Sequence, residues 1–417
     1  MKKLKLGIFA LSIISLLNSC KNDQKNTNDR GYEEVNLANK MEVIPDQFII
    51  VFKNSFILPT SLKLNKASSR EESSIINENY KRENLFKIDD LLLSYGIDPS
   101  AVMEYYTDAL SGVALRVTED QVSRIRYDRN VAFVEQDKII TLPNDVIESE
   151  EEGGLRAQTT PCGITNAGGS ADGSASTKWI WIVDTGIDLT HPDLNVETNT
   201  AYAKSFVGGS PNDCHGHGTH CAGIAAAKNN TIGVIGVSAG ARVVPVRVLN
   251  CQGSGQTSGI LAGLNHVAAN DEPGDVINMS LGGYWGSNCA TGSSYVTAIT
   301  NLGNAGTRVC VAGGNSADNA ALYTPACING TNVYTVAAMD CAKAWASYSN
   351  YGIPPTDWIA TGSSVYSTYK NGGYATLSGT SMATPHVAGI VHSRQADPLQ
   401  NGSVIKNGVT YKIAVRQ

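Results

Sequence analysis

The chain is 417 residues long and 42% of these residues are hydrophobic, which is enough for a full α/β domain with one large core and for a smaller domain beside it. Its formal net charge of −6 is spread along the chain, and no block of Lys or Arg outside the extreme N-terminus forms a nucleic-acid-binding footprint. Composition and charge therefore argue against a nucleic-acid partner and leave the function to the motifs.

The N-terminus has the form of an export signal. Three lysines among the first five residues precede an apolar stretch, residues 6–17, that is too short to span a bilayer. The stretch ends in Leu17-Asn18-Ser19-Cys20, which resembles a bacterial lipoprotein signal, where cleavage before the cysteine leaves a thiol for lipid attachment. An ordinary signal peptide with an incidental cysteine is the alternative. We expect residues 1–19 to be removed, residues 20–42 to form a polar tether, and the protein to be extracellular or anchored at the cell envelope by a lipid on Cys20.

Cysteines are concentrated in the second part of the chain. Eight of the nine lie from Cys162 onward. This density in an exported chain favours disulfide bonds formed in an oxidising compartment.

Residues 43–142 are predicted to form a small, self-contained α+β domain. The residues that follow, 143–160, include four glutamates between Glu148 and Glu152 and then Gly153-Gly154, a composition too charged and too glycine-rich to pack. We interpret them as a cleavable linker. In the small domain, hydrophobic patterns indicate strands at Phe48–Phe52, Gly112–Val117 and Ala132–Val134 and helices near Ile88–Tyr95 and Glu119–Arg126.

Residues 161–417 have the pattern of an α/β domain with a mostly parallel sheet flanked by helices, because apolar strands alternate with helical segments. Apolar residues at helical spacing predict a helix over Thr257–Ala269, with Thr257 or Ser258 available as its N-cap. Buried strands are predicted at Trp179–Val183, Ala241–Leu249, Val276–Ser280, Arg308–Ala312 and Val333–Ala338.

Three segments of this domain place a reactive type of side chain beside glycine: Trp181-Ile-Val-Asp184-Thr-Gly, His215-Gly-His217-Gly-Thr-His220 and Gly379-Thr-Ser381-Met-Ala-Thr-Pro385. Attack on a peptide carbonyl needs a hydroxyl, a base that takes its proton, and an acid that orients and stabilises the charged imidazole. Ser381, His217 and Asp184 supply these groups. A histidine with an ordinary pKa of about 6.5 is mostly neutral at pH 7, so His217 can accept the serine proton.

The neighbours of Ser381 suit a nucleophile. A helix predicted over Ser381–Ser393 leaves the Ser381 N–H without an intrahelical acceptor, so this group can face a developing oxyanion. Pro385 cannot donate to the carbonyl of Ser381, four residues back, and this leaves the first turn irregular. Asn315, which follows a predicted strand and two glycines, is the candidate for the second oxyanion donor.

In the order Asp, His, Asn, Ser, these motifs resemble those of the subtilisin family, and His217-Gly-Thr-His-Cys221 most resembles its proteinase K-like branch. The resemblance runs from about residue 158 to residue 389. Upstream, Gln47-Phe-Ile-Ile-Val-Phe52 and Val131-Ala-Phe-Val-Glu135-Gln-Asp137 resemble the inhibitory propeptide of this family. The resemblance implies a subtilisin-like fold and a serine endopeptidase of broad specificity that acts on proteins or peptides and is made as a self-processing proenzyme.

The resemblance also implies the binding residues. Two facing segments would sandwich an extended substrate by backbone hydrogen bonds. Asp357 and the carbonyls of Thr331 and Val333 would hold a structural calcium ion, which prefers such oxygen ligands. No cofactor is expected for the chemistry, and the enzyme is expected to be a monomer. The implied substrate-binding residues are Ser280, Leu281 and Gly282 on one side, Gly253, Ser254 and Gly255 on the other, and Gly314.

The cysteines allow several pairings. If Cys221 is a free thiol beside the active site, one of the others is unpaired or intermolecular, and spacing alone does not settle the connectivity. The resemblance implies the pair Cys214–Cys251, and our hypotheses for further pairs are Cys289–Cys310 and Cys327–Cys341.

Three alternatives were weighed against the peptidase. Zinc is one, since Cys214 to Cys221 crowd nitrogen and sulfur ligands, but a helix begun at His217 turns His217 and His220 toward the triad and the sheet rather than toward one ion. An esterase with the same triad normally has Gly-x-Ser-x-Gly and the order Ser, Asp, His. A catalytically weak surface lipoprotein that binds extended peptides would need a lost triad or oxyanion residue, and none is missing.

The expected mechanism is acyl transfer. His217 deprotonates Ser381, the Ser381 N–H and Asn315 hold the oxyanion, and water later releases the acyl-enzyme. We expect residues 43–142 to act as an intramolecular inhibitor until the chain cuts itself between about Glu152 and Thr160.

Overall fold

The computed structural model describes residues 42–62, 70–142, 145–151, 156–286, 289 and 293–417. The chain divides into two units, Met1–Asn39 and Lys40–Gln417. The expected export signal, Cys20 and nearly all of the polar tether lie outside the described residues. Within the described part of the chain, no helix is long and apolar enough to cross a membrane.

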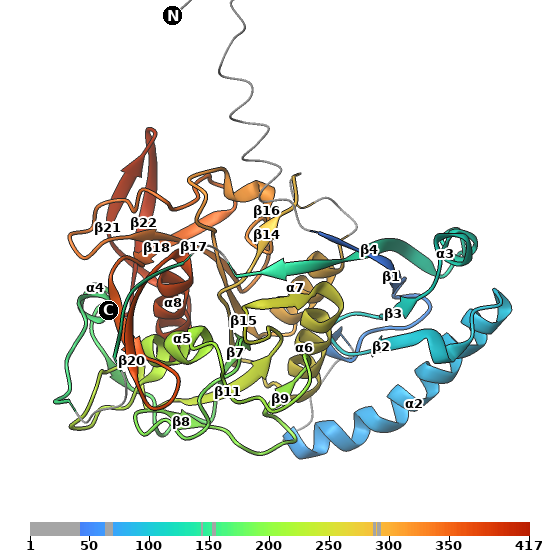
Figure 1. Ribbon diagram of the computed structural model, residues 1–417, viewed down its shortest axis with the longest axis horizontal. Helices are drawn as coiled ribbons and strands as arrows, with labels where there is room; N and C mark the ends of the chain where they lie inside the picture. The colour runs from blue at the N-terminus through green and yellow to red at the C-terminus, as the bar shows by residue number, and fades with distance from the viewer. Residues whose placement is uncertain (1–41, 63–69, 143–144, 152–155, 287–288, 290–292) are drawn as a thin grey trace, which may run out of the picture. The chain divides into compact units, whose positions relative to one another are not determined.

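The small domain is an antiparallel sheet with two helices (Figure 1). Alternate residues of its central strand point to opposite faces. Phe48, Ile50 and Phe52 pack in the domain's own core, whereas Ile49 and Val51 belong to a core shared with the larger domain. The sheet is therefore apolar on both faces. The elements are β1 (Val43–Phe52), α2 (Arg70–Ser94), β2 (Val102–Tyr106), β3 (Gly112–Arg116), α3 (Glu119–Ile125) and β4 (Val131–Thr141), with the strand order β4-β1-β3-β2.

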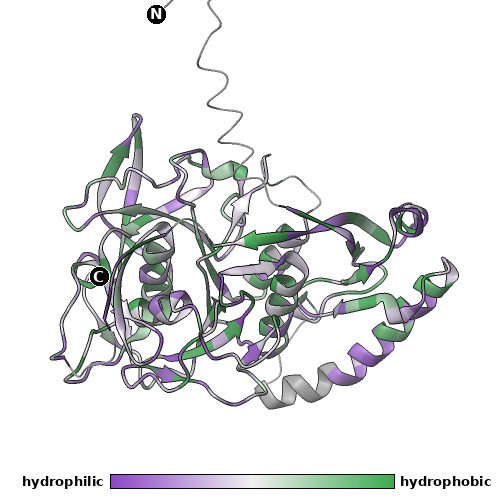
Figure 2. Ribbon diagram, viewed as in Figure 1, coloured by the Kyte–Doolittle hydropathy of each residue, from purple (hydrophilic) through white to green (hydrophobic). Residues whose placement is uncertain are grey.

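Local sequence signals explain where these elements were predicted and where they were not. α3 begins after Thr118 because Thr118 and Gln121 form a capping box. β2 was not predicted because its sequence, Val-Met-Glu-Tyr-Tyr, does not alternate between apolar and polar residues, and four of its five residues are half-buried. In Figure 2 the strands carry hydrophobic stretches, whereas the coloured part of α2 is hydrophilic in the middle of the helix and more hydrophobic toward its end.

The larger domain is built on the predicted parallel sheet, and the α/β fold is confirmed. The strands at its centre are buried along most of their length because helices cover both faces. The central strands are β7 (Ile180–Asp184), β11 (Arg242–Arg247), β13 (Val276–Met279), β15 (Arg308–Ala312), β17 (Val333–Met339) and β18 (Thr356–Thr361), in the order β18-β17-β15-β13-β7-β11.

β7 divides the core into two layers. Ile180 and Ile182 face α5 (His217–Ala226) and α8 (Thr380–Arg394), while Trp181 and Val183 face α6 (Thr257–Asn270) and α7 (Ser294–Asn304). The remaining elements are α4 (Cys162–Asn166), β6 (Ala171–Asp172), β8 (Asn195–Val196), β9 (Lys204–Ser205), β10 (Ser238–Ala239), β12 (Ser254–Gln256), β14 (Gly283–Tyr284), β16 (Tyr323–Thr324), β19 (Val365–Thr368), β20 (Tyr374–Ser378), β21 (Leu399–Lys406), β22 (Val409–Val415) and the 3-10 helices η1 (Thr60–Leu62), η2 (Pro99–Ala101) and η3 (Ala320–Leu322).

Part of the acidic segment is a strand, contrary to the sequence-based interpretation. β5 (Val146–Glu151) pairs antiparallel with β20. The expectation that this segment is too charged to pack is wrong for these residues, because hydroxyl groups of β19, β20 and the adjoining turns donate to its glutamates.

The small domain supplies caps for two helices of the larger one. The N-cap of α6 is Gln256, not Thr257 or Ser258, and it makes no side-chain capping bond. The Asp137 carboxylate of β4 accepts instead from the Ser258 N–H at 3.0 Å and from its hydroxyl. Glu135 bonds in the same way to Ser294 at the start of α7. A carboxylate at a helix N-terminus is stabilised by the free N–H groups and by the helix dipole, so these contacts fasten the two domains together.

Candidate active site

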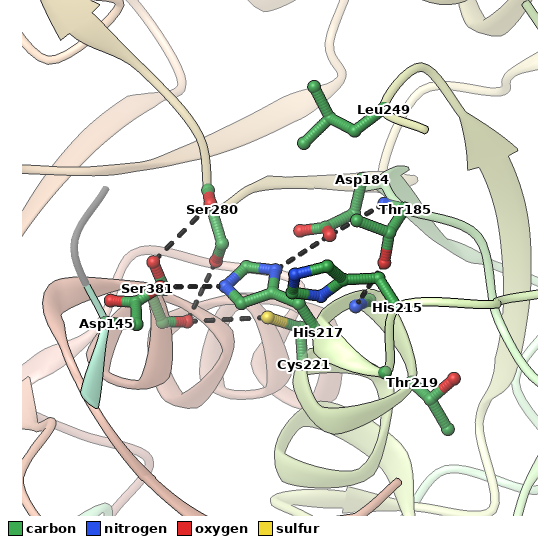
Figure 3. Close-up of polar contacts among 12 residues, drawn as sticks. Asp145, Asp184, Thr185, His215, His217, Thr219, Cys221, Leu249, Ser280 and Ser381 are labelled. Carbon is green, nitrogen blue, oxygen red and sulfur yellow. Dashed lines mark hydrogen bonds and ion pairs between the residues drawn. The ribbon is translucent and has the colours of Figure 1, made fainter. Parts of the chain in front are cut away.

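Asp184 and His217 form a buried pair at the carboxyl end of the sheet. Asp184 ends β7 and His217 begins α5, and the histidine Nδ1 lies 2.7 Å from the Asp184 Oδ1 (Figure 3). Both side chains are almost fully buried. The Thr185 N–H donates to the same carboxylate oxygen at 2.7 Å. This geometry orients the ring so that Nε2 faces the cleft.

A second aspartate, which the sequence analysis did not single out, fixes the start of α5. One oxygen of the Asp213 carboxylate accepts from the Thr185 hydroxyl and the Gly216 N–H at 2.9 Å each. The other oxygen accepts from the Thr219 N–H at 3.0 Å and from its hydroxyl. Gly216, at φ 112°, adopts the left-handed conformation that lets the chain turn into the helix. Asp213 therefore positions His217 by capping its helix.

Ser381 lies in the first turn of α8, where Pro385 leaves its carbonyl without a helical partner. That carbonyl accepts instead from the Ser280 hydroxyl at 2.8 Å and from the Cys221 thiol at 3.5 Å. The Ser381 hydroxyl lies 3.4 Å from the Ser280 carbonyl (Figure 3). Ser280 thus supports the turn that carries Ser381.

Asn315 presents its amide N–H₂ to the same point. The Thr380 N–H and hydroxyl both donate to Asn315 Oδ1 at 2.8 Å, which fixes the amide so that Nδ2 faces the cleft. Gly314 allows the turn before it, at φ 101°, and a Cβ there would lie 2.3 Å from the Asn350 Nδ2. The Gly314 N–H donates to Thr380 at 3.0 Å, so Gly314 supports the placement of Asn315.

The carboxylate of Asp145 fills the space between His217 and Asn315. Its Oδ2 lies 3.0 Å from His217 Nε2, and its Oδ1 accepts from Asn315 Nδ2 at 2.6 Å. Burial alone would lower the pKa of His217, but the carboxylates of Asp184 and Asp145 outweigh it and raise that pKa to about 10. His217 is therefore held as an imidazolium in this conformation. Sequence reasoning missed Asp145, because nothing in the acidic segment distinguishes it.

The small domain occupies the cleft beside this centre. β4 pairs antiparallel with β12, with Thr141 opposite Ser254 and Ile140 opposite Gly255, and the Leu142 N–H donates to the Gly253 carbonyl at 2.9 Å. One of the two segments implied to bind substrate thus binds a strand of this same chain.

The other implied segment is packed more tightly. Leu281 is fully buried in the core beneath the cleft. A Cβ at Gly282 would lie 2.7 Å from the Thr324 carbonyl, so the backbone passes very close to β16.

The implied calcium ligands come from neighbouring strands. Val333 begins β17, and Asp357 lies on β18 with its Oδ2 accepting from the Thr335 N–H at 2.8 Å. Burial raises the pKa of Asp357 to about 6. The Thr331 carbonyl lies against Gly303 of α7. A half-buried carboxylate and backbone carbonyls are the kinds of oxygen donor that calcium needs, although the contacts of Asp357 here are to Thr335 and that of the Thr331 carbonyl is to Gly303.

Two of the expected disulfide pairs are wrong. Cys310 lies inside the buried strand β15 and has a free thiol, which leaves Cys289 to pair with a loop cysteine. Cys221 is also free and buried, beside Ser381. The bonds present are Cys214–Cys251, as the resemblance implies, together with Cys289–Cys327 and Cys162–Cys341 in place of Cys289–Cys310 and Cys327–Cys341.

The residues considered for zinc are divided among other partners. Cys214 is in a disulfide, and the His220 Nε2 lies 3.1 and 3.0 Å from two backbone carbonyls. Burial lowers the pKa of His220 to about 3. Among the described residues, one group of potential ligand atoms lies within 4.8 Å, from Asp184, His217 and Cys221, and both ring nitrogens of His217 are already bonded to carboxylates.

This fold and this centre define a serine peptidase with an inhibitory domain in its cleft. Comparison with known proteins gives the same result. The model of the subtilase family matches residues 177–405, and that of the peptidase inhibitor I9 family matches residues 47–143. The chain belongs to the subtilase family, and it is a serine endopeptidase preceded by an inhibitor domain.

Two named relatives are similar to this chain over more than two thirds of its length. The extracellular serine proteinase of Thermus sp. (strain Rt41A) is 36% identical over 362 residues, which cover 84% of this chain and 80% of the relative. The cuticle-degrading protease of Metarhizium anisopliae is 33% identical over 290 residues, covering 68% and 71%. A solved structure of a cold-adapted subtilisin-like serine proteinase is 31% identical, covering 60% of this chain and 91% of that one, with a TM-score of 0.49. The family excludes the esterase alternative, and the two relatives described above are named as a proteinase and a protease rather than as binding proteins.

Proposed function

We propose that Ser381, His217 and Asp184 are the catalytic triad and that Asn315 and the Ser381 N–H form the oxyanion hole. The observation that carries this proposal is the convergence of the His217 Nε2 and the Asn315 Nδ2 on one carboxylate beside Ser381, where a substrate carbonyl would bind. With that place free, His217 takes the Ser381 proton and donates it to the leaving amine, and water then hydrolyses the acyl-enzyme.

The test expresses the wild-type chain, Ser381→Ala and Ser393→Ala side by side. Ser393 lies on the same helix and donates only to the Ile390 carbonyl, so its variant is the control. We expect the wild type and Ser393→Ala to lose the residue 43–142 domain and to hydrolyse casein. Ser381→Ala should keep the domain and lose hydrolysis about 10⁶-fold, the size known for loss of the nucleophile in a subtilisin. Processing of Ser381→Ala at the wild-type rate would refute the proposal.

We further propose that the protein is exported and lipidated on Cys20. Support comes from the signal-like N-terminus and from a relative named as an extracellular proteinase. Metabolic labelling with a radioactive fatty acid should mark the wild type and not Cys20→Ser. Equal labelling of the two, or labelling of neither, contradicts lipid attachment at Cys20.

Calcium binding at Asp357, Thr331 and Val333 is the third proposal. Calcium at 100 times its Kd should stabilise the folded protein by about 2.7 kcal/mol. Thermal unfolding of the Ser381→Ala chain with calcium and with chelator measures this effect, and Asp357→Asn should remove it. An identical calcium response in the Asp357→Asn chain would contradict the site.

A further inference from the structure

Asp145 lies in the catalytic centre, and β5, which follows it directly, pairs with β20, whereas β4 pairs with β12. The Asp145 side chain is 7% exposed, and its carboxylate bonds to His217 (Figure 3) and to Asn315. From the next residue onward, β5 adds to the edge of β20, with Val146 opposite Ser378. β20 leads directly into the turn that carries Ser381. The segment therefore occupies the part of the cleft that receives the leaving-group side of a substrate.

Each of the three glutamates of residues 145–151 accepts a hydrogen bond from a hydroxyl group of the larger domain. Glu148 accepts from the Ser364 hydroxyl at 3.0 Å and from the Ser378 hydroxyl. Glu150 accepts from Tyr369 at 3.3 Å, and Glu151 accepts from Tyr366 at 2.9 Å. These donors come from β19, β20 and the turns that adjoin them. A row of hydroxyl donors along a strand edge is a surface that suits an extended acidic peptide.

The stretch expected to be cut lies elsewhere in this conformation. The Gly233 N–H donates to the Arg156 carbonyl at 2.9 Å, and the Thr159 N–H donates to the Gly233 carbonyl at 2.8 Å. Residues 156–159 are thus bonded to the loop at 231–233, while Asp145 occupies the catalytic centre. Ser381 cannot act on that stretch until Asp145 has left.

We propose that the edge of β20, with the hydroxyls of Ser364, Tyr366, Tyr369 and Ser378, is a binding site for extended acidic peptides, and that its resident ligand, Asp145–Glu151, keeps the precursor inactive. Asp145 would be the inhibitory residue, because its carboxylate is hydrogen-bonded to the oxyanion donor, Asn315, and to the general base, His217, at the same time. This inhibitory strand is distinct from the residue 43–142 domain, and the proposal rests on the triad proposed above.

A simple ordered linker is the rival interpretation. It would fill the same strand edge without restraining the enzyme, and removing the Asp145 carboxylate would then change neither the rate of maturation nor the state of His217.

The first measurement is the rate at which the full-length precursor matures. Asp145→Ala should mature about tenfold faster than the wild type or more, since the charge-assisted hydrogen bonds of this carboxylate to His217 and Asn315 are lost. Asp90→Ala removes an exposed carboxylate of α2 and serves as the matched control. Maturation of Asp145→Ala at the wild-type rate or slower would overturn the proposal.

The second measurement does not need an active enzyme. In the Ser381→Ala precursor the His217 ring is followed by NMR as the pH is raised, with Asp145 present and with Asp145→Ala. The pKa of His217 should fall by at least about one unit when Asp145 is removed. If the pKa of His217 is the same with and without the Asp145 carboxylate, the proposal that Asp145–Glu151 is an inhibitory strand is overturned. A wild-type chain that never matures, together with the expected NMR shift, would instead contradict the proposed triad and leave the strand supported.

Discussion

Two strands of the same chain fill the cleft from its two sides, and they are held by different interactions. We call β4 the first half of this filling and β5 the second half. On one side Ile140 and its neighbours in β4 pair with β12, and Ile140 is 1% exposed. On the other side β5 pairs with β20, and Ile147 is 47% exposed. Strand addition is common to both. Apolar burial stabilises the first half, whereas carboxylate–hydroxyl bonds hold the second, so the second half can be released without unfolding the first.

Among the substitutions that leave Ser381 in place, the largest expected effect is at Asp184, the partner of His217. Asp184→Asn should leave the fold intact and reduce kcat about 10⁴-fold, as the loss of this carboxylate does in other serine peptidases. The reason is that an amide neither fixes the His217 ring in the right tautomer nor stabilises its charge. Steady-state kinetics on matured protein measure the effect. A loss of kcat smaller than tenfold would contradict the role of Asp184 as the residue that orients and stabilises His217.

The oxyanion donor comes next in size. Asn315→Ala should lower kcat by about 100- to 1,000-fold, the range known for this amide in a subtilisin, with little change in KM. A matching rise in KM with unchanged kcat would show that Asn315 binds substrate in the ground state instead.

One substitution made in each half sharpens the comparison directly. In the Ser381→Ala precursor, Ile140→Ala should reduce the free energy of unfolding by about 2–5 kcal/mol, because it leaves a cavity at a buried site. Ile147→Ala in β5 should change it by no more than about 0.5 kcal/mol, because that side chain is half-exposed. Denaturant unfolding measures both. Equal costs at the two positions would contradict the distinction between the halves.

Because Glu135 of β4 caps α7, the docking of the small domain on the larger one depends on pH. Burial raises the pKa of Glu135 from its ordinary value to about 7, even though Ser294 bonds to it. The docked state therefore binds a proton more tightly than the free state, and docking is favoured below pH 4.5 and weakens as the pH rises toward 7.

For such a pKa shift, the free energy of unfolding of the precursor falls by at most about 3 kcal/mol as the pH rises. Unfolding free energies of the Ser381→Ala precursor between pH 4.5 and 8 measure it, and Glu135→Gln should flatten that part of the profile. A Glu135→Gln profile as steep as that of the parent would assign the pH dependence to other groups.

The parts of the molecule that follow from local pattern were predictable. The parallel strands and α6 were found because buried strands and amphipathic helices leave strong periodic signals. Asp184, His217, Ser381 and Asn315 lie in motifs with a glycine one or two residues away. In the structure Asp184 bonds to His217, His217 and Asn315 bond to the Asp145 carboxylate, and Ser381 lies next to them (Figure 3).

The features that the sequence did not predict depend on contacts between segments that lie far apart in the chain. The N-cap of α6 was misassigned because its capping carboxylate, Asp137, belongs to the other domain. β5 was overlooked because its glutamates are bonded by hydroxyls far along the chain. Cys214–Cys251 was expected correctly, but the other two cysteine pairs were wrong because spacing does not reveal that Cys310 is enclosed in a strand.

The most direct test of the account is covalent labelling of the matured enzyme with an organophosphorus fluoride, followed by mapping of the label by mass spectrometry. The account predicts one label per molecule, on Ser381, with loss of casein hydrolysis in proportion to labelling. Activity that survives complete labelling of Ser381, or a label on another residue that accompanies the loss, would contradict it.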